Sequence, residues 1–197
     1  MNVLHLDSSI LGEASASRQL TRRLVDGIRA ANPQARVTYR DLAAEPLPHY
    51  SAASLAASDA PQAQRDAAAL EAFLGAEVIV IGAPLYNFTV PSQLKAWLDR
   101  ITIKGRTFRY TASGPQGLAG GRKVIVALAR GGLYAPGAGT EFAESYLKFL
   151  FGFLGIDDVT FVRAEGLGIS AEHREASLAA AHRVIAALHR PPAALAA

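Results

Sequence analysis

The chain has 197 residues, of which 50% are apolar and 19% are charged, with a formal net charge of +3. This length and composition predict one packed domain over residues 1–197. The absence of cysteine excludes disulfides, thiolate metal sites and thiol nucleophiles. We find no basic block with interleaved aromatics, no apolar run near the ~18 residues of a membrane span, and no signal-peptide pattern. We therefore expect a cytoplasmic protein without a metal site and without nucleic-acid or membrane partners.

Strands and helices are predicted to alternate along the chain. In order they are a strand at 2–7, helix at 17–31, strand at 35–40, helix at 60–74, strand at 78–81, helix at 91–101, strand at 123–128, helix at 141–154, strand at 159–162 and helix at 170–189. Leu20, Leu24 and Ile28 have the spacing of one helix face. The connection at 41–60 is expected on the surface, and 107–121 is expected to be irregular.

This alternation predicts an α/β fold, namely a doubly wound five-stranded parallel sheet with helices on both faces. The β-branched run at 78–81 is typical of a strand covered on both sides. In such sheets a ligand binds at the carboxyl ends of the strands, beside the point where the strand order reverses. We therefore looked for a site in the loops after the first, third and fourth strands.

The loop after the first strand is rich in serine and leads directly into a helix. Ser9, Ser15 and Ser17 add hydroxyl groups to the free N–H groups of a helix N-terminus, which suits a phosphate. The dinucleotide pattern G-x-G-x-x-G is missing, so a mononucleotide phosphate is the better match. Two alternatives remain open: a serine that only caps the helix, and a serine nucleophile, which is disfavoured because no histidine is placed as its base.

The loop after the third strand exposes apolar and aromatic side chains around one amide. Leu85, Tyr86 and Phe88 suit the plane of a flat ring system, and Asn87 suits its polar edge. The alternative is a hydrophobic loop packed on its own core.

The loop after the fourth strand contains paired glycines. Gly131 and Gly132 permit close backbone approach and leave N–H donors for a carbonyl or an anionic nitrogen at a ring edge. Glycine pairs also mark ordinary turns, so the position opposite the other two loops is what gives them weight.

Together these residues resemble the FMN-dependent NAD(P)H azoreductases, also described as quinone reductases, which have a flavodoxin-like fold. The resemblance runs from end to end and rests on S-S-I-L-G at 8–12, S-A-S at 15–17, P-L-Y-N-F at 84–88, Q-L-K-A-W-L-D at 93–99, T-F-R-Y-T-x-x-G-P-x-G-L at 107–118, R-G-G at 130–132 and G-F-L-G-I-D-D-V at 152–159. Relatives often carry Met at position 85, a polar amide at 16, Ser at 129 and an aromatic at 163.

The resemblance implies tightly bound FMN and assigns residues to it. The phosphate is expected at Ser9, Ser15, Ala16 and Ser17, and the isoalloxazine at Leu85, Tyr86, Asn87, Phe88, Ala129, Arg130, Gly131 and Gly132. Asn87 and the N–H groups of Gly131 and Gly132 are expected to tune the flavin. Tyr110 and Tyr134 are candidate walls of the substrate pocket.

The implied activity is a ping-pong cycle in which NADH or NADPH reduces FMN and a quinone or azo compound takes up the electrons. No side chain is needed as a nucleophile, because the cofactor carries the chemistry. The resemblance also implies a homodimer. The alternative is a flavodoxin-type electron carrier acting with a protein partner, although the mildly basic charge differs from the acidic surface of such carriers.

Overall fold

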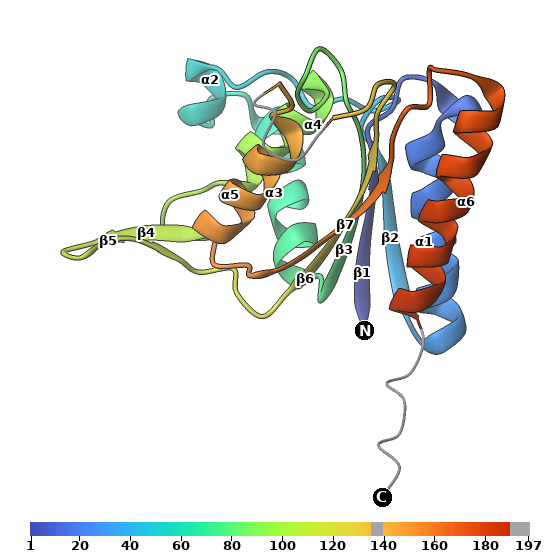
Figure 1. Ribbon diagram of the computed structural model, residues 1–197. Helices are drawn as coiled ribbons and strands as arrows, with labels where there is room; N and C mark the ends of the chain where they lie inside the picture. The colour runs from blue at the N-terminus through green and yellow to red at the C-terminus, as the bar shows by residue number, and fades with distance from the viewer. Residues whose placement is uncertain (135–139, 190–197) are drawn as a thin grey trace, which may run out of the picture.

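The computed structural model describes residues 1–134 and 140–189. The predicted domain, 1–197, also includes 135–139 and 190–197, which lie outside the described residues. Its centre is a parallel sheet of five strands in the order β2-β1-β3-β6-β7 (Figure 1). The strands are β1 (Asn2–Asp7), β2 (Arg36–Asp41), β3 (Val78–Pro84), β6 (Lys123–Ala129) and β7 (Asp158–Ala164). The order reverses at β1, because β2 lies on one side of it and the later strands lie on the other. This confirms the predicted doubly wound flavodoxin-like fold.

Helices cover both faces of the sheet (Figure 1). One face carries α1 (Ala16–Ala31) and α6 (Ala171–Leu188), and the other carries α3 (Ala60–Gly75), α4 (Ser92–Ile101) and α5 (Ala143–Phe153). Within residues 1–134 and 140–189, none of the helices combines the length and the apolar character needed to cross a membrane.

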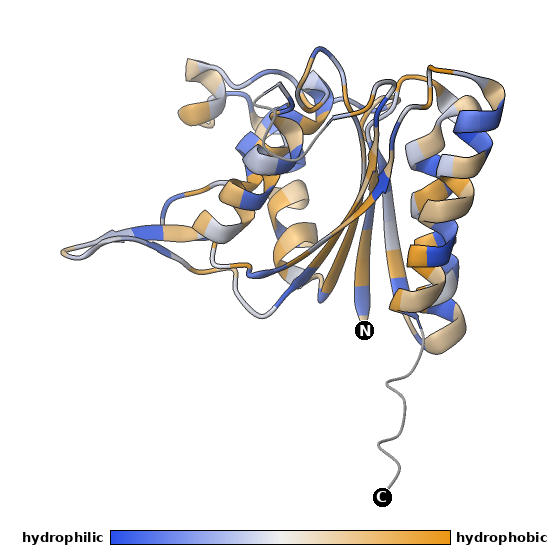
Figure 2. Ribbon diagram, viewed as in Figure 1, coloured by the Kyte–Doolittle hydropathy of each residue, from blue (hydrophilic) through white to orange (hydrophobic). Residues whose placement is uncertain are grey.

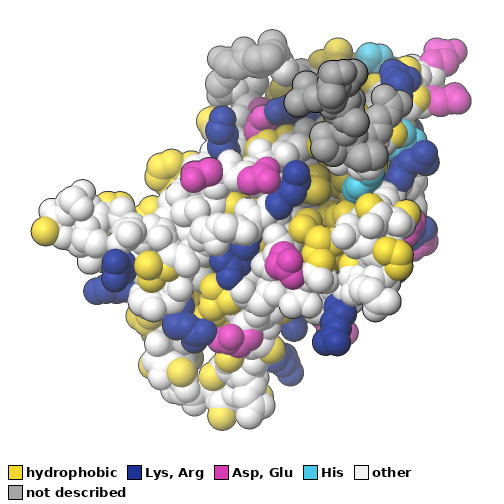
Figure 3. All heavy atoms as spheres, turned by 90° about the horizontal axis from the view of Figure 1, so that it is seen from below, with side chains coloured by type: hydrophobic (Ala, Val, Ile, Leu, Met, Phe, Trp, Pro, Cys, Tyr) yellow, Lys and Arg dark blue, Asp and Glu magenta, His cyan; other side chains and the backbone are white. Residues whose placement is uncertain are grey.

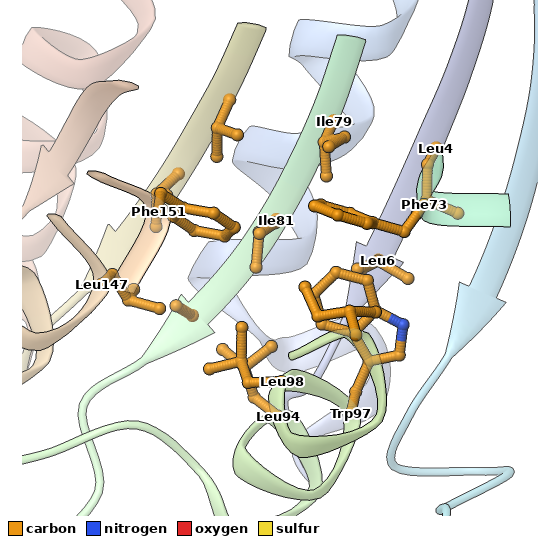
Figure 4. Packing of buried hydrophobic residues seen from close by; sticks show 14 of the residues in the cluster. Leu4, Leu6, Phe73, Ile79, Ile81, Leu94, Trp97, Leu98, Leu147 and Phe151 are labelled. Atoms are coloured by element: carbon orange, nitrogen blue, oxygen red, sulfur yellow. The ribbon is translucent and has the colours of Figure 1, made fainter. Parts of the chain in front are cut away.

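The central strands are apolar on both faces, which explains their unbroken apolar runs (Figure 2). Alternate residues of β3 point to opposite sides. Ile79 and Ile81 join the larger core with Phe73, Trp97 and Phe151 (Figure 4), whereas Val80 joins the smaller core beneath α1 and α6. Seen from below, at the amino ends of the strands, Lys/Arg and Asp/Glu side chains are scattered and form no block of one sign (Figure 3).

Local caps explain where the helices begin. The Ser15 hydroxyl accepts a hydrogen bond from the Arg18 N–H at 3.3 Å, so α1 begins at Ala16. The Asp59 carboxylate accepts from the Gln62 N–H at 3.1 Å and caps α3 in the same way. The predicted strands and helices are present, with ends displaced by a few residues.

One of the two predictions about the connections was wrong. Residues 107–121 contain an antiparallel hairpin, β4 (Phe108–Thr111) and β5 (Gly114–Gly117), which projects from the body (Figure 1). Its glycines have low strand propensity, but Gly117 lies so close to Gly155 that a Cβ would come within 2.2 Å of the Gly155 N. The 41–60 connection lies mostly on the surface, as predicted. It includes the short helix α2 (Ala52–Leu55), and Leu42 and Leu47 anchor it in the larger core.

Candidate ligand site at the carboxyl edge of the sheet

The loops after β1, β3 and β6 lie together, because these strands are neighbours and end at the same edge of the sheet (Figure 1). Hydrogen bonds join them in pairs. The hydroxyls of Ser9 and Tyr86 are 3.3 Å apart, and the Leu85 N–H donates to the Ala129 carbonyl at 2.8 Å. The three loops selected from the sequence therefore form one continuous rim.

The first loop presents buried hydroxyls at the N-terminus of α1. Ser9, Ser15 and Ser17 are buried, and the Ser15 and Ser17 hydroxyls are 3.0 Å apart. Ser15 also caps the helix, so the capping alternative holds for this serine without excluding a second role. Among the described residues, nothing accepts a hydrogen bond from the N–H groups of Ala16 and Ser17. This arrangement offers donors to an anion.

The second loop contains a strained turn. Tyr86 and Thr89 exchange backbone hydrogen bonds of 3.0 and 3.1 Å, which places Asn87 at φ +48° and Phe88 at φ +72°. Asparagine tolerates this left-handed region, whereas a bulky aromatic residue rarely adopts it. Phe88 is nevertheless 56% exposed, and its carbonyl accepts from the Phe142 N–H at 2.9 Å. A strained and exposed aromatic at a loop rim is a feature of functional sites.

The third loop is held through its carbonyl groups. Gly131 accepts from the Gly168 N–H and Gly132 from the Gly166 N–H, both at 2.9 Å. Over residues 1–134 and 140–189, the N–H groups of Gly131 and Gly132 find no acceptor. The turn after β7 thus fixes the loop and leaves its donors to a ligand.

Arg130 differs from the other residues assigned to this loop. Its side chain is buried and forms ion pairs of 3.2, 3.0 and 2.8 Å with Glu141, Glu144 and Glu165. Arg163 also pairs with Glu144, and its hydrogen bonds hold the pKa of Glu144 below the ordinary value despite partial burial. The Arg130 guanidinium therefore anchors the loop to α5 and to the turn after β7. Its backbone is held there as well, because its N–H donates to the Ala164 carbonyl at 2.8 Å and its carbonyl accepts from the Leu167 N–H at 3.0 Å.

The two candidate pocket tyrosines lie in different places. Tyr134 is half-buried beside Gly132, and its ring centre is 5.7 Å from the Arg130 guanidinium carbon. Tyr110 is 64% exposed on the β4–β5 hairpin, which projects away from the rim (Figure 1). Within one chain the structure brings Tyr134, but not Tyr110, to the three loops.

A groove of about 580 Å³ opens beside the second loop. It lies between this loop and α4, and its walls are Ile10, Tyr86, Asn87, Thr89, Val90, Ser92, Gln93, Lys95 and Tyr146. Four of these side chains are apolar or aromatic, four are polar and uncharged, and Lys95 is a cation, which suits a flat organic molecule with polar edges. Among the described residues, no group of three or more His, Asp or Glu is placed to hold a metal ion.

Comparison with known proteins identifies the family. A family model described as the flavodoxin-like fold matches residues 1–188. The FMN-dependent NADH:quinone oxidoreductase of Xanthomonas oryzae pv. oryzae is 56% identical over 181 residues, which cover 92% of this chain and 93% of that protein. The chain belongs to this oxidoreductase family.

Other members of the family and of the fold agree. The FMN-dependent NADH:quinone oxidoreductase 1 of Pseudomonas syringae pv. tomato is 54% identical over 198 residues, covering 94% of this chain and 96% of its own. An azoreductase from Bacillus anthracis str. Sterne superposes with a TM-score of 0.85 at 29% identity, covering 96% of this chain and 98% of that one. An FMN-dependent NADH-azoreductase from Bacillus anthracis str. Ames Ancestor, solved in complex with FMN, superposes with a TM-score of 0.84 at 26% identity. The match covers 96% of this chain and 100% of that one.

Sequence analysis of this oxidoreductase missed a buried polar network beneath the first loop. Arg18 pairs with Asp41 and donates to the Ser9 carbonyl, and Tyr39 and Thr21 donate to the buried Asp7. One signal was present in the sequence: an arginine in the first turn of α1, where the helix dipole disfavours a cation.

Proposed function

We propose that this chain is an FMN-dependent NADH:quinone oxidoreductase that works by a ping-pong cycle and also reduces azo compounds. The observation that carries the proposal is the rim itself. It brings together buried hydroxyls and N–H groups at the start of α1 and the N–H groups of Gly131 and Gly132, and none of these N–H groups has an acceptor among residues 1–134 and 140–189. The identity above 50% to named oxidoreductases of this activity supports it.

The residues present fit FMN. The hydroxyls of Ser9, Ser15 and Ser17 and the N–H groups of Ala16 and Ser17 would bind the phosphate, because together they form a buried set of donors at the positive end of a helix. Ala16 contributes only its backbone, as expected from its lack of a polar side chain.

The other two loops fit the isoalloxazine. Leu85, Tyr86 and the exposed Phe88 would contact the ring, and Asn87 would address a polar ring atom. Ala129 and the backbone of Arg130 would line the opposite edge, where the N–H groups of Gly131 and Gly132 would donate to the ring.

When bound, FMN would supply two-electron redox chemistry between NADH and an acceptor. The chain positions the partners and stabilises charge. Fixed backbone donors at Gly131 and Gly132 need no rearrangement to meet negative charge at the ring edge. The groove beside Asn87 and Tyr146 offers an apolar surface for planar quinones and azo compounds.

We also propose that the protein is a homodimer. Phe142, the residue before α5, and Phe149 on α5 are 54% and 74% exposed. Tyr146 and Phe153 share this helix face at spacings of three or four residues and are half-buried against the larger core. Exposed aromatic side chains on one face are typical of a protein interface, and two-fold dimers are the commonest oligomers. Light scattering should give the mass of two chains for the wild type and of one for Phe149→Asp, with the neighbouring Lys148→Asp as the control; one chain for the wild type contradicts the dimer.

Turnover and flavin uptake test the proposed activity. The purified chain should take up FMN and oxidise NADH with a small quinone in the absence of any partner protein. Initial rates at several concentrations of both substrates should give parallel double-reciprocal lines, as a ping-pong cycle requires, and an azo dye should be decolourised. FMN uptake without quinone turnover would favour the electron carrier, and failure to take up FMN would refute both functions. Running the assay with NADPH decides the choice of nucleotide.

A further inference from the structure

We propose that Arg18 is a positioning residue of this site. Together with Asp41 it holds the Ser9 carbonyl, and so fixes the β1–α1 loop in the shape that distinguishes a phosphorylated flavin from an unphosphorylated one. The inference rests on the proposed function insofar as FMN is the ligand.

The Arg18 guanidinium is saturated by protein groups. Nη1 and Nη2 donate to the two Asp41 oxygens, each at 2.7 Å. Nη2 and Nε donate to the Ser9 carbonyl at 2.7 and 3.3 Å, and Nη1 also donates to the Tyr39 hydroxyl at 3.2 Å. A guanidinium has only five N–H donors, so none is left over for a phosphate. Arg18 therefore acts through Ser9 and does not touch the ligand.

Ser9 is held from both sides. Arg18 binds its carbonyl, and among the described residues no other group donates to that oxygen. Its hydroxyl lies 3.3 Å from the Tyr86 hydroxyl and accepts from the Leu11 N–H at 3.3 Å. Because Ser9 is fully buried, loss of Arg18 would leave a buried carbonyl without a partner and release the loop.

Arg18 also compensates buried negative charge beneath the loop. Asp7 and Asp41 end the adjacent strands β1 and β2 in register, and Arg18 Nη1 lies 2.7 Å from Asp41 Oδ2 and 4.0 Å from Asp7 Oδ2. Without this cation, two carboxylates would face an arriving phosphate dianion. Riboflavin carries no such charge, so the effect should fall on FMN and spare riboflavin.

The test measures dissociation constants of FMN and riboflavin with protein stripped of flavin. Arg18→Lys keeps the charge but cannot form the two-pronged pair. We expect FMN to bind about tenfold more weakly and riboflavin to bind within about twofold of wild type. Arg106→Lys is the matched control, because it changes an exposed arginine–glutamate pair outside the three loops and should leave both constants unchanged.

Asp41→Glu is the second variant, in case Arg18→Lys does not fold. It keeps the negative charge but displaces the carboxylate that holds Arg18, so it should lower the FMN to riboflavin selectivity in the same direction and by less. Equal weakening of both flavins, or unchanged FMN binding in a folded variant, overturns the positioning role. Wild-type protein that binds riboflavin as well as FMN overturns it too, whereas wild-type protein that binds neither refutes the proposed function instead.

Discussion

The hydroxyls of Ser9 and Tyr86 lie 3.3 Å apart and join the loop after β1 to the loop after β3. Tyr86 also accepts from the Ile10 N–H at 3.2 Å, so one phenol organises the segment that is proposed to hold the phosphate. Tyr86→Phe should therefore weaken FMN binding by about five- to tenfold, the effect of losing a hydrogen bond or two. Flavin fluorescence titration measures this, with Tyr50→Phe as the control, and equal affinities in wild type and Tyr86→Phe would contradict the link.

Ser15 and Ser17 should separate stability from phosphate binding. Ser15 caps α1, so Ser15→Ala should lower the free energy of unfolding by about 1 kcal/mol and also weaken the binding of FMN. Ser17 does not cap the helix, so Ser17→Ala should lower the free energy of unfolding by less than Ser15→Ala does. It should weaken the binding of FMN more than the binding of riboflavin. Urea unfolding and flavin titration check this. Ser170→Ala, which removes the cap of α6, should lower stability without changing FMN binding; an equal loss of both flavins in Ser17→Ala would exclude contact with the phosphate.

Periodicity predicted the sheet because the pattern is local. The run at 78–81 alternates between two buried cores, and the serine before α1 is a recognisable cap. The carboxyl ends of β1, β3 and β6 then meet by topology alone. The position of the rim could thus be inferred before any contact within it was known.

Side-chain partners distant in sequence could not be predicted in this way. The sequence places Arg130 in a loop and gives no sign of its ion pairs with Glu144 on α5 and with Glu165, which follows β7. The hairpin at 107–121 was missed because its glycines have low strand propensity, and one of them, Gly117, is required by the close approach of Gly155. Such features depend on how elements pack, which a single sequence does not encode locally.

Phe88 should show that strain is retained for activity. Glycine relieves the left-handed strain, by about 1 kcal/mol, and loses a similar amount through the greater freedom of the unfolded chain. The free energy of unfolding of Phe88→Gly should therefore lie within about 1 kcal/mol of the wild-type value. Its kcat/KM for quinones should fall about tenfold, because the contact made by the exposed ring is lost. Ala57→Gly relieves a similar φ of +49° in the 41–60 connection and should leave turnover unchanged. Wild-type turnover in Phe88→Gly would show that the ring is dispensable.

The two arginines around Glu144 should differ sharply in their effect on stability. Arg130 is 4% exposed and pairs with three glutamates, so Arg130→Met leaves a cluster of half-buried carboxylates without its buried cation and should lower the free energy of unfolding by about 3 kcal/mol. The Arg163 side chain is 44% exposed, so Arg163→Met should cost less than about 1 kcal/mol. Urea denaturation compares the two variants, and similar losses would show that burial does not govern this cluster.

Asp41 should make stability depend on pH in the acid range. Its hydrogen bonds from Arg18 hold its pKa below the ordinary value of 3.8, so the folded state binds this proton less readily than the unfolded chain does. The stabilisation is therefore complete above the unfolded pKa and is lost as the pH falls through the lower folded pKa. Unfolding free energies of wild type and Asp41→Asn should differ most near pH 6 and converge toward about pH 3, because the asparagine does not titrate. Arg18 stays charged throughout this range, and Asp7, whose pKa is also lowered, is common to both proteins. A constant difference between the two pH values would mean that the Asp41 charge contributes nothing to folding.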